Sequence, residues 1–126
     1  MWGLEKATGF ESRLKKFSKK HEVETSAAFS NLQTYVDVLN ETDNLQAANQ
    51  QPFVHAEPDG MVAIDQRGAH IERTTGKLKA TRLYVYAAVI NQTVYLLGIG
   101  DKDSQKQDLQ TFSKKMKQII KGLGND

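Results

Sequence analysis

Residues 82–102 contain the side chains of this chain best suited to phosphate chemistry. In the run RLYVY, Arg82, Tyr84 and Tyr86 occur at every second position, so on a β-strand all three point to one face. The guanidinium of Arg82 can bind two phosphate oxygens at once, and a phenol can stack on a base or donate a proton. Lys102 follows the next apolar run and adds positive charge at the mouth of the same sheet. This combination predicts a site for a polyanion.

Basic and acidic residues are segregated along the chain. The net charge is only +2, but residues 22–65 contain eight Asp or Glu and no Lys or Arg, so all 17 basic residues lie in the flanks. If the two basic segments meet in space, they form a surface for an anionic backbone. The alternative is that these lysines are the solvated faces of ordinary helices. The lysines predicted to bind RNA are Lys15, Lys16, Lys19, Lys106, Lys114 and Lys115.

The candidate site residues also have a purely structural interpretation. Tyr84 and Tyr86 are ordinary strand formers, and packing between strands accounts for them. Arg82 on an exposed strand is equally explained by solvation or by an ion pair, and Lys102 by its place in a loop before a helix.

The three histidines give no metal motif. His21, His55 and His70 include no i, i+4 pair, and the chain has no cysteine, so the sequence predicts no metal site and no cofactor. No side chain stands out as a general base. His55 and His70 lie in predicted loops from which either can reach the site.

Hydrophobic periodicity predicts the elements that must position these residues. Thr8 is the predicted N-cap of the first helix, and Ser104 with Gln107 resembles a capping box at the start of the last one. The polar segment 41–59 is predicted to be a loop. The predicted elements are a strand at 2–7, helices at 10–21 and 24–40, strands at 61–65, 78–87 and 93–99, and a helix from about 104 to 121 that Gly122 and Gly124 stop.

This order predicts a single α+β domain over residues 1–126, with two layers. The strands at 61–65, 78–87 and 93–99 form an antiparallel sheet, and the two early helices pack on one face of it. The other face is expected to be partly open and to display Arg82, Tyr84 and Tyr86. The sequence has no membrane-length apolar run and no signal-peptide core, and it lacks cysteine, which together predict a cytoplasmic protein.

Three phrases of the sequence resemble the RelE/ParE superfamily of type II toxin–antitoxin toxins. The stretch TGF at 8–10 leading into LKKF at 14–17 is similar to the first helix of that family, and RLYVY at 82–86 resembles its central strand. GDKDSQ at 100–105, followed by Asp108 and Leu109, resembles a phrase of its RelE/HigB-like addiction-module killer branch. The chain is longer than a typical member, mainly through residues 41–76, and less basic than the ribosome-bound toxins.

The resemblance implies a RelE-like fold and a metal-independent endoribonuclease, an mRNA interferase. Such a toxin cuts messenger RNA, usually on the ribosome, inhibits translation and is neutralised by a small antitoxin. Catalysis would fall to Arg82, Lys102, Tyr84 and Tyr86, with a base and an acid for the proton transfers and positive charge on the phosphorane. Two alternatives stay open. One is a ParE-like toxin that binds gyrase without nuclease chemistry, and the other is a catalytically silent RelE-fold regulatory or binding protein.

Overall fold

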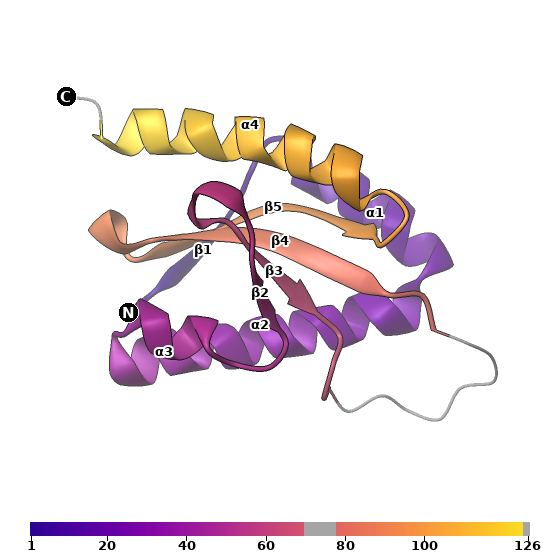
Figure 1. The fold of residues 1–126 in the computed structure, drawn as a ribbon, viewed down its shortest axis with the longest axis horizontal. Coiled ribbons are helices and arrows are strands. Elements are labelled where there is room, and N and C mark those ends of the chain that lie inside the picture. The colour runs from indigo at the N-terminus through magenta and orange to yellow at the C-terminus, as the bar shows by residue number, and fades with distance from the viewer. Residues whose placement is uncertain (70–77, 125–126) are drawn as a thin grey trace.

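The structure is a computed structural model that describes residues 1–69 and 78–124 (Figure 1). His70 and the turn predicted at 74–76 therefore lie outside the described residues. The α+β class predicted from the sequence is confirmed. The elements are strand β1 Gly3–Lys6, helices α1 Phe10–Lys20, α2 Glu22–Thr42 and α3 Leu45–Asn49, strands β2 Val54–Ala56, β3 Val62–Asp65, β4 Thr81–Ala88 and β5 Thr93–Asp101, and helix α4 Gln105–Gly124.

The strands form one five-stranded sheet in the order β1-β5-β4-β3-β2. The pairs β2–β3, β3–β4 and β4–β5 are antiparallel, whereas the pair β1–β5 is parallel, so the sheet is mixed. The predicted hairpin is confirmed as β4 and β5. A 3₁₀ turn at Val89–Asn91 joins them, and Gln92 takes a left-handed conformation (φ 49°) where the chain reverses.

One face of the sheet is covered by α2 and by apolar side chains of α1. Arg13 ties α1 to the sheet, because its Nε donates to the carbonyl oxygen of Ile99 on β5 (2.7 Å). The prediction that both early helices pack on one face is confirmed. The predicted residues that lie in this core or pack against it are Phe10, Leu14, Phe17, Leu32, Tyr35, Val36 and Leu39.

The opposite face, which was expected to be partly open, is covered by α4 (Figure 1). Phe112 and Met116 of α4 are fully buried against a second cluster that includes Tyr84 and Leu97. Gly98 permits this approach, because a Cβ there would lie 2.1 Å from the ring of Phe112. The prediction that this face displays Tyr84 was therefore wrong. The helical period identified the apolar side chains of α4 that pack on the core, but it does not predict which face of the sheet they cover.

A bulge in β5 decides which side chains face α4. Tyr84 pairs with Gly98 and Val85 pairs with Leu96, so Leu97 is an extra residue between two paired ones. The alternation of β5 shifts by one residue at this point, and Gly100 then faces α4. A Cβ at Gly100 would lie 2.0 Å from a carboxylate oxygen of Asp108, so only glycine leaves room for that side chain.

The segment 41–59, predicted as a loop, contains a short helix and an edge strand. Helix α3 buries Ala48 in the core shared with α2, and Phe53 is buried just before β2. Strand β2 then pairs with β3. The polar composition gave no signal for these elements, because the few apolar residues of this segment suffice to anchor it on an existing core.

Two predicted helix caps differ from the structure. Helix α1 begins after Gly9 (φ 86°), so Thr8 is not its N-cap. At the start of α4, Asp101 Oδ1 accepts the N–H groups of Asp103 (3.0 Å) and Ser104 (3.1 Å). The Ser104 hydroxyl donates to Asp108 Oδ2 (2.6 Å) rather than capping with Gln107.

Candidate functional site

Arg82 lies at the start of β4, directly between two neighbouring strands. Its backbone pairs with Asp65 of β3 and with Gly100 of β5. The side chain lines a cavity of about 260 Å³ that we call the arginine pocket. Three of its residues are cationic. The pocket is lined by Asp65, Gln66, Arg67, Ala80, Thr81, Arg82 and Lys102.

Backbone hydrogen bonds bring Lys102 to this pocket. The N–H of Lys102 donates to the carbonyl oxygen of Ala80 (3.1 Å), which ties the β5–α4 turn to the start of β4. The N–H of Thr81 donates to Gln66 Oε1 (3.1 Å) and closes the opposite wall. The structure therefore unites Arg82 and Lys102, as the sequence predicted, and adds Arg67.

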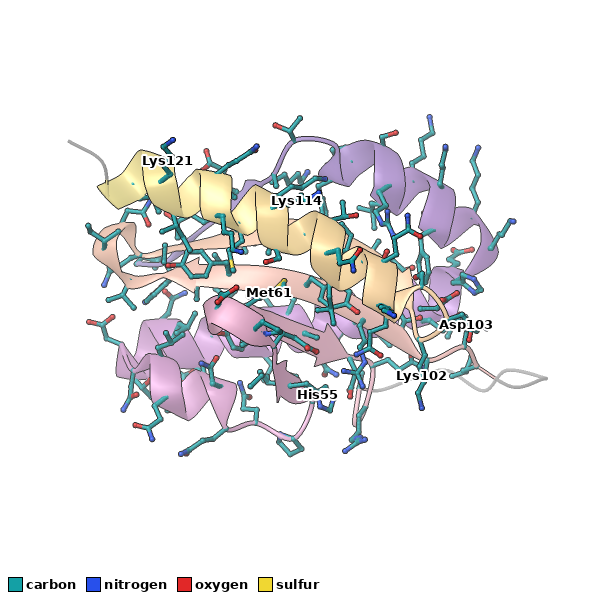
Figure 2. All side chains as sticks on the ribbon, turned by 45° about the horizontal axis from the view of Figure 1, so that its top comes forward. His55, Met61, Lys102, Asp103, Lys114 and Lys121 are labelled. Atoms are coloured by element: carbon teal, nitrogen blue, oxygen red, sulfur yellow. The ribbon has the colours of Figure 1, made fainter. Side chains whose placement is uncertain are left out.

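A histidine and an aspartate form a close pair beside the pocket. His55 of β2 lies with its Nε2 2.5 Å from Asp65 Oδ2, and the other oxygen of Asp65 accepts the N–H of Arg67 (2.7 Å). With both carboxylate oxygens engaged, Asp65 holds the imidazole in one orientation. Figure 2 labels His55 and Lys102, which come from β2 and from the β5–α4 turn.

Asn31 of α2 fixes the segment that carries this aspartate. Its Nδ2 donates to the carbonyl oxygens of Asp65 (2.8 Å) and Arg67 (2.9 Å), and the side chain is buried. The end of β3 is thus anchored from the opposite layer of the fold.

A half-buried residue, Glu57, adds a carboxylate to the cluster. Glu57 Oε2 lies 3.6 Å from Arg82 Nη1, and the Glu57 side chain is only 10% exposed. Burial raises the pKa of Glu57, and the charges of Arg82 and His55 oppose this shift without cancelling it. Two groups able to carry a proton are therefore part of this cluster: Glu57 lies beside the Arg82 guanidinium, and His55 contacts Asp65.

The two tyrosines predicted for the site do not join this cluster. Tyr84 is fully buried, its ring lies 5.3 Å from that of Phe112, and burial raises the pKa of its phenol to about 12. The structure therefore places Tyr84 under α4 and away from the arginine pocket, contrary to the expectation that it is displayed beside Arg82. Tyr86 is half-buried at the edge of the α4 cluster and does not line the arginine pocket.

The predicted RNA-binding lysines lie on two adjacent helices. An ion pair between Arg13 of α1 and Asp108 of α4 holds the helices side by side. Lys115 is half-buried near the ring of Phe112, and burial, followed by the charge of Arg13, lowers its pKa. Figure 2 shows Lys114 on the outer surface of α4. The exposed members of the predicted set are Lys15, Lys16, Lys19, Lys106 and Lys114.

Reasoning from sequence missed Asp65, Glu57, Arg67 and Asn31. The signals were weak: Asp65, Glu57 and Arg67 are single polar residues at or just after the end of a short strand, and Asn31 is one polar residue in the middle of α2. Only the register of β3 against β4 places Asp65 opposite Arg82, and register is not readable from these short strands.

In residues 1–69 and 78–124, no group of three or more His, Asp or Glu is arranged to hold a metal ion. No helix in the same part of the chain has the length and apolar character needed to cross a membrane. Comparison with protein-family models, with curated proteins and with solved structures gives no match.

Proposed function

We propose that this protein is an endoribonuclease that cleaves RNA at the arginine pocket, and that it acts as the messenger-RNA-cutting toxin of a toxin–antitoxin pair. The observation that carries the proposal is that Arg82 and Lys102 line one small cavity, while Glu57 pairs with Arg82 and His55 contacts Asp65 of the cavity wall. The family resemblance supplies the biological setting: a cytoplasmic toxin that cuts messenger RNA and is neutralised by a small antitoxin.

The reaction proposed is attack of a ribose 2′-hydroxyl on the adjacent phosphorus. The new bond forms a 2′,3′-cyclic phosphate, and the bond to the 5′-oxygen breaks to release a 5′-hydroxyl end. A base must take the 2′-proton, an acid must protonate the leaving oxygen, and charge must stabilise the phosphorane. Each of these three tasks has a residue suited to it.

Arg82 takes the phosphate. Its planar guanidinium matches two phosphoryl oxygens, and burial strengthens the interaction by excluding water. Lys102 and Arg67 neutralise the flanking backbone phosphates. They contribute binding that falls as salt rises, because each phosphate neutralised releases counterions.

His55 and Glu57 take the proton transfers. If the N–H of His55 Nε2 is donated to Asp65, the lone pair on Nδ1 is left to accept the 2′-proton. Glu57, whose pKa burial raises, is assigned the proton transfer to the 5′-oxygen. Asp65 is a positioning residue, since it acts through the imidazole.

The test is cleavage of a labelled single-stranded RNA by the purified protein in the presence of EDTA. We expect products with cyclic-phosphate and 5′-hydroxyl ends, and no cleavage where the scissile 2′-hydroxyl is replaced by hydrogen. Arg82→Ala should lower the rate by about 10²–10³. Lys102→Ala should weaken cleavage in a way that higher RNA concentration partly restores, and Lys121→Ala, far along α4, is the matched control with no loss.

The cellular arm of the test is regulated expression in a bacterium. Growth arrest with loss of transcript integrity, reversed by a small protein encoded beside the gene, supports the toxin proposal. Arrest with intact transcripts and inhibited DNA supercoiling would instead indicate the gyrase-binding alternative.

One observation favours a catalytically silent binding protein as the second candidate. Arg82 already has a carboxylate partner in Glu57, which a phosphate must compete with. If neither RNA cleavage nor toxicity is seen while the Arg82→Ala protein keeps its melting temperature, this second reading is the better one.

A further inference from the structure

A second cavity lies on the other side of the β5–α4 turn from the arginine pocket. Its volume is about 470 Å³, within the range of small-ligand sites. It is formed where α1 passes the end of β5, and Gly100, the backbone partner of Arg82, is part of its wall. We call this cavity the α1 pocket.

The α1 pocket is strongly cationic. Lys16, Lys19 and Lys20 line it, and none of the three forms an ion pair with any described residue. Arg13 also lines it, but its charge is matched by Asp108. The net charge that faces a ligand therefore comes from the three lysines.

The acidic residue in the wall does not cancel this charge. Asp101 directs Oδ1 to the N–H groups of Asp103 and Ser104 at the start of α4. Its carboxylate is thus held against the helix N-terminus, where the helix dipole stabilises it. The same contact occupies two N–H groups of that terminus, so the cationic character of the pocket rests on the side chains of α1.

Two rings supply an apolar wall. Phe17 and His21 lie 4.6 Å apart between ring centroids, and both are half-buried. Each keeps part of its ring surface accessible in a pocket otherwise lined by long cationic chains. Aromatic rings next to free cations are what single-stranded nucleic-acid sites use, because bases stack on the rings and phosphates meet the charges.

We infer that the α1 pocket binds one nucleotide of the RNA substrate, next to the nucleotide cleaved in the arginine pocket. The base stacks on Phe17 and His21, and its phosphate lies against Lys16, Lys19 and Lys20. The β5–α4 turn separates the two pockets, so a strand leaving Arg82 crosses this turn to reach α1. This inference rests on the proposed function for its choice of RNA as the ligand.

Binding can be measured without cleavage, using a fluorescent hexanucleotide with 2′-O-methyl sugars. Lys16→Glu combined with Lys20→Glu should weaken binding at least tenfold at about 0.1 M salt. It should also reduce the slope of log affinity against log salt concentration by the equivalent of about two phosphate contacts. The matched control is Lys117→Glu with Lys121→Glu in the C-terminal half of α4, which changes net charge equally away from the α1 pocket and should weaken binding less. Equal losses in the two double variants would overturn the pocket and leave only a diffuse basic surface.

Stacking needs a separate test, because charge reversal does not detect it. Phe17→Leu keeps an apolar side chain against the core and removes the ring, and we expect about tenfold weaker binding. Six hexanucleotides, each abasic at one position, locate the stacked base. At that position the abasic change should weaken binding to the wild-type protein and have no effect on Phe17→Leu. If the abasic change at every one of the six positions weakened binding to Phe17→Leu as much as binding to the wild-type protein, the inference would be overturned.

The two proposals fail in different ways. A protein that binds the hexanucleotide through the α1 pocket but cuts no RNA leaves this inference intact and removes the nuclease. A protein that cuts RNA at Arg82 but binds equally well without Lys16, Lys20 and the Phe17 ring leaves the nuclease intact and removes the second pocket.

Discussion

Both faces of the sheet bury apolar side chains, but the polar side chains on the two faces have different kinds of partner. On the face covered by α2, the buried polar side chains of Asn31 and Glu24 are bonded to backbone groups of neighbouring segments. On the face covered by α4, the apolar cluster includes Tyr84, and beyond it Arg82 and Asp65 line a cavity, with Glu57 paired to Arg82 and His55 to Asp65.

Under the proposed function, this difference separates the residues that stabilise the fold from those that carry out the chemistry. Side chains alternate along β4, so Leu83 faces the α2 core while Arg82, one residue earlier, faces the α4 side. Polar groups that hold backbone have little remaining capacity for a ligand. Polar groups paired only with one another at a cavity can exchange partners, which is what binding and catalysis require.

The largest expected effect tests the α4 side of the comparison. His55→Ala should lower the rate of RNA cleavage by about 10²–10⁴ if the imidazole carries the 2′-proton. Single-turnover cleavage at saturating RNA measures this step apart from binding. The control is His21→Ala, which removes a ring from the α1 pocket and should alter affinity without this loss at saturation. Equal rates for His55→Ala and wild type would remove His55 from the mechanism.

The next effect tests the α2 face. Leu83 is fully buried in the core, so Leu83→Ala should reduce the free energy of unfolding by about 2–5 kcal/mol, measured by urea titration. Arg82→Ala, its neighbour on the strand, leaves Glu57 without its partner, but uptake of a proton by Glu57 limits this cost, so the variant should lose less stability than Leu83→Ala while losing cleavage. If the two variants lost stability equally, the division of labour between the faces would be wrong.

A smaller effect concerns the charge on the α2 face. Burial acts to raise the pKa of Glu24, but hydrogen bonds from the backbone N–H of Lys79 and from its own N–H, with the charge of His21, lower it overall. A lowered native pKa stabilises the fold at pH values above the unfolded value and loses this effect as the pH falls. Glu24→Gln should therefore be less stable than wild type by about 1–2 kcal/mol near pH 7.

The same comparison near pH 3 should show little difference between Glu24→Gln and wild type. Urea titrations at the two pH values check this, with exposed Glu22→Gln as the control in the same helical turn. If the difference in free energy of unfolding between Glu24→Gln and wild type did not change with pH, the ionised form of Glu24 would make no contribution to stability.

The smallest effect is at Tyr84. Its hydroxyl is buried and has no hydrogen-bond partner among the residues that the structure describes. Tyr84→Phe removes this unpaired group and should leave stability unchanged or raise it by up to about 1 kcal/mol, with cleavage unaffected. Loss of cleavage in Tyr84→Phe at unchanged melting temperature would restore Tyr84 to the site and sharpen the boundary between apolar cluster and cavity.

Local patterns predicted much of the fold. The alternation in residues 82–86 and the run after Gln92 identified the hairpin, and the spacing of Leu32, Tyr35 and Leu39 identified the helix that covers it. Both signals depend only on side-chain periods of two and 3.6 residues, which are properties of the chain itself. Strand β2 gave no such signal because three residues are too few to show a period.

The site was predicted in part. Arg82 and Lys102 were identified because their chemical types suit a phosphate, and the pocket brings them together. Tyr84 was assigned to the site because it shares a strand face with Arg82. The prediction that both side chains lie on the same face of β4 was correct. The sequence did not predict that α4 covers Tyr84 and leaves Arg82 uncovered.

The sequence by itself determined the α+β class, the hairpin, the amphipathic helices and the basic flanks, since all of these follow from residue type and spacing. Only the tertiary structure decided that α4 covers the second face, that Asp65 lies opposite Arg82, and that His55 and Glu57 join them. The physical reason is that these contacts depend on strand register and helix docking. A bulge at Leu97 and two glycines, Gly98 and Gly100, set that docking through distances between residues far apart in the chain.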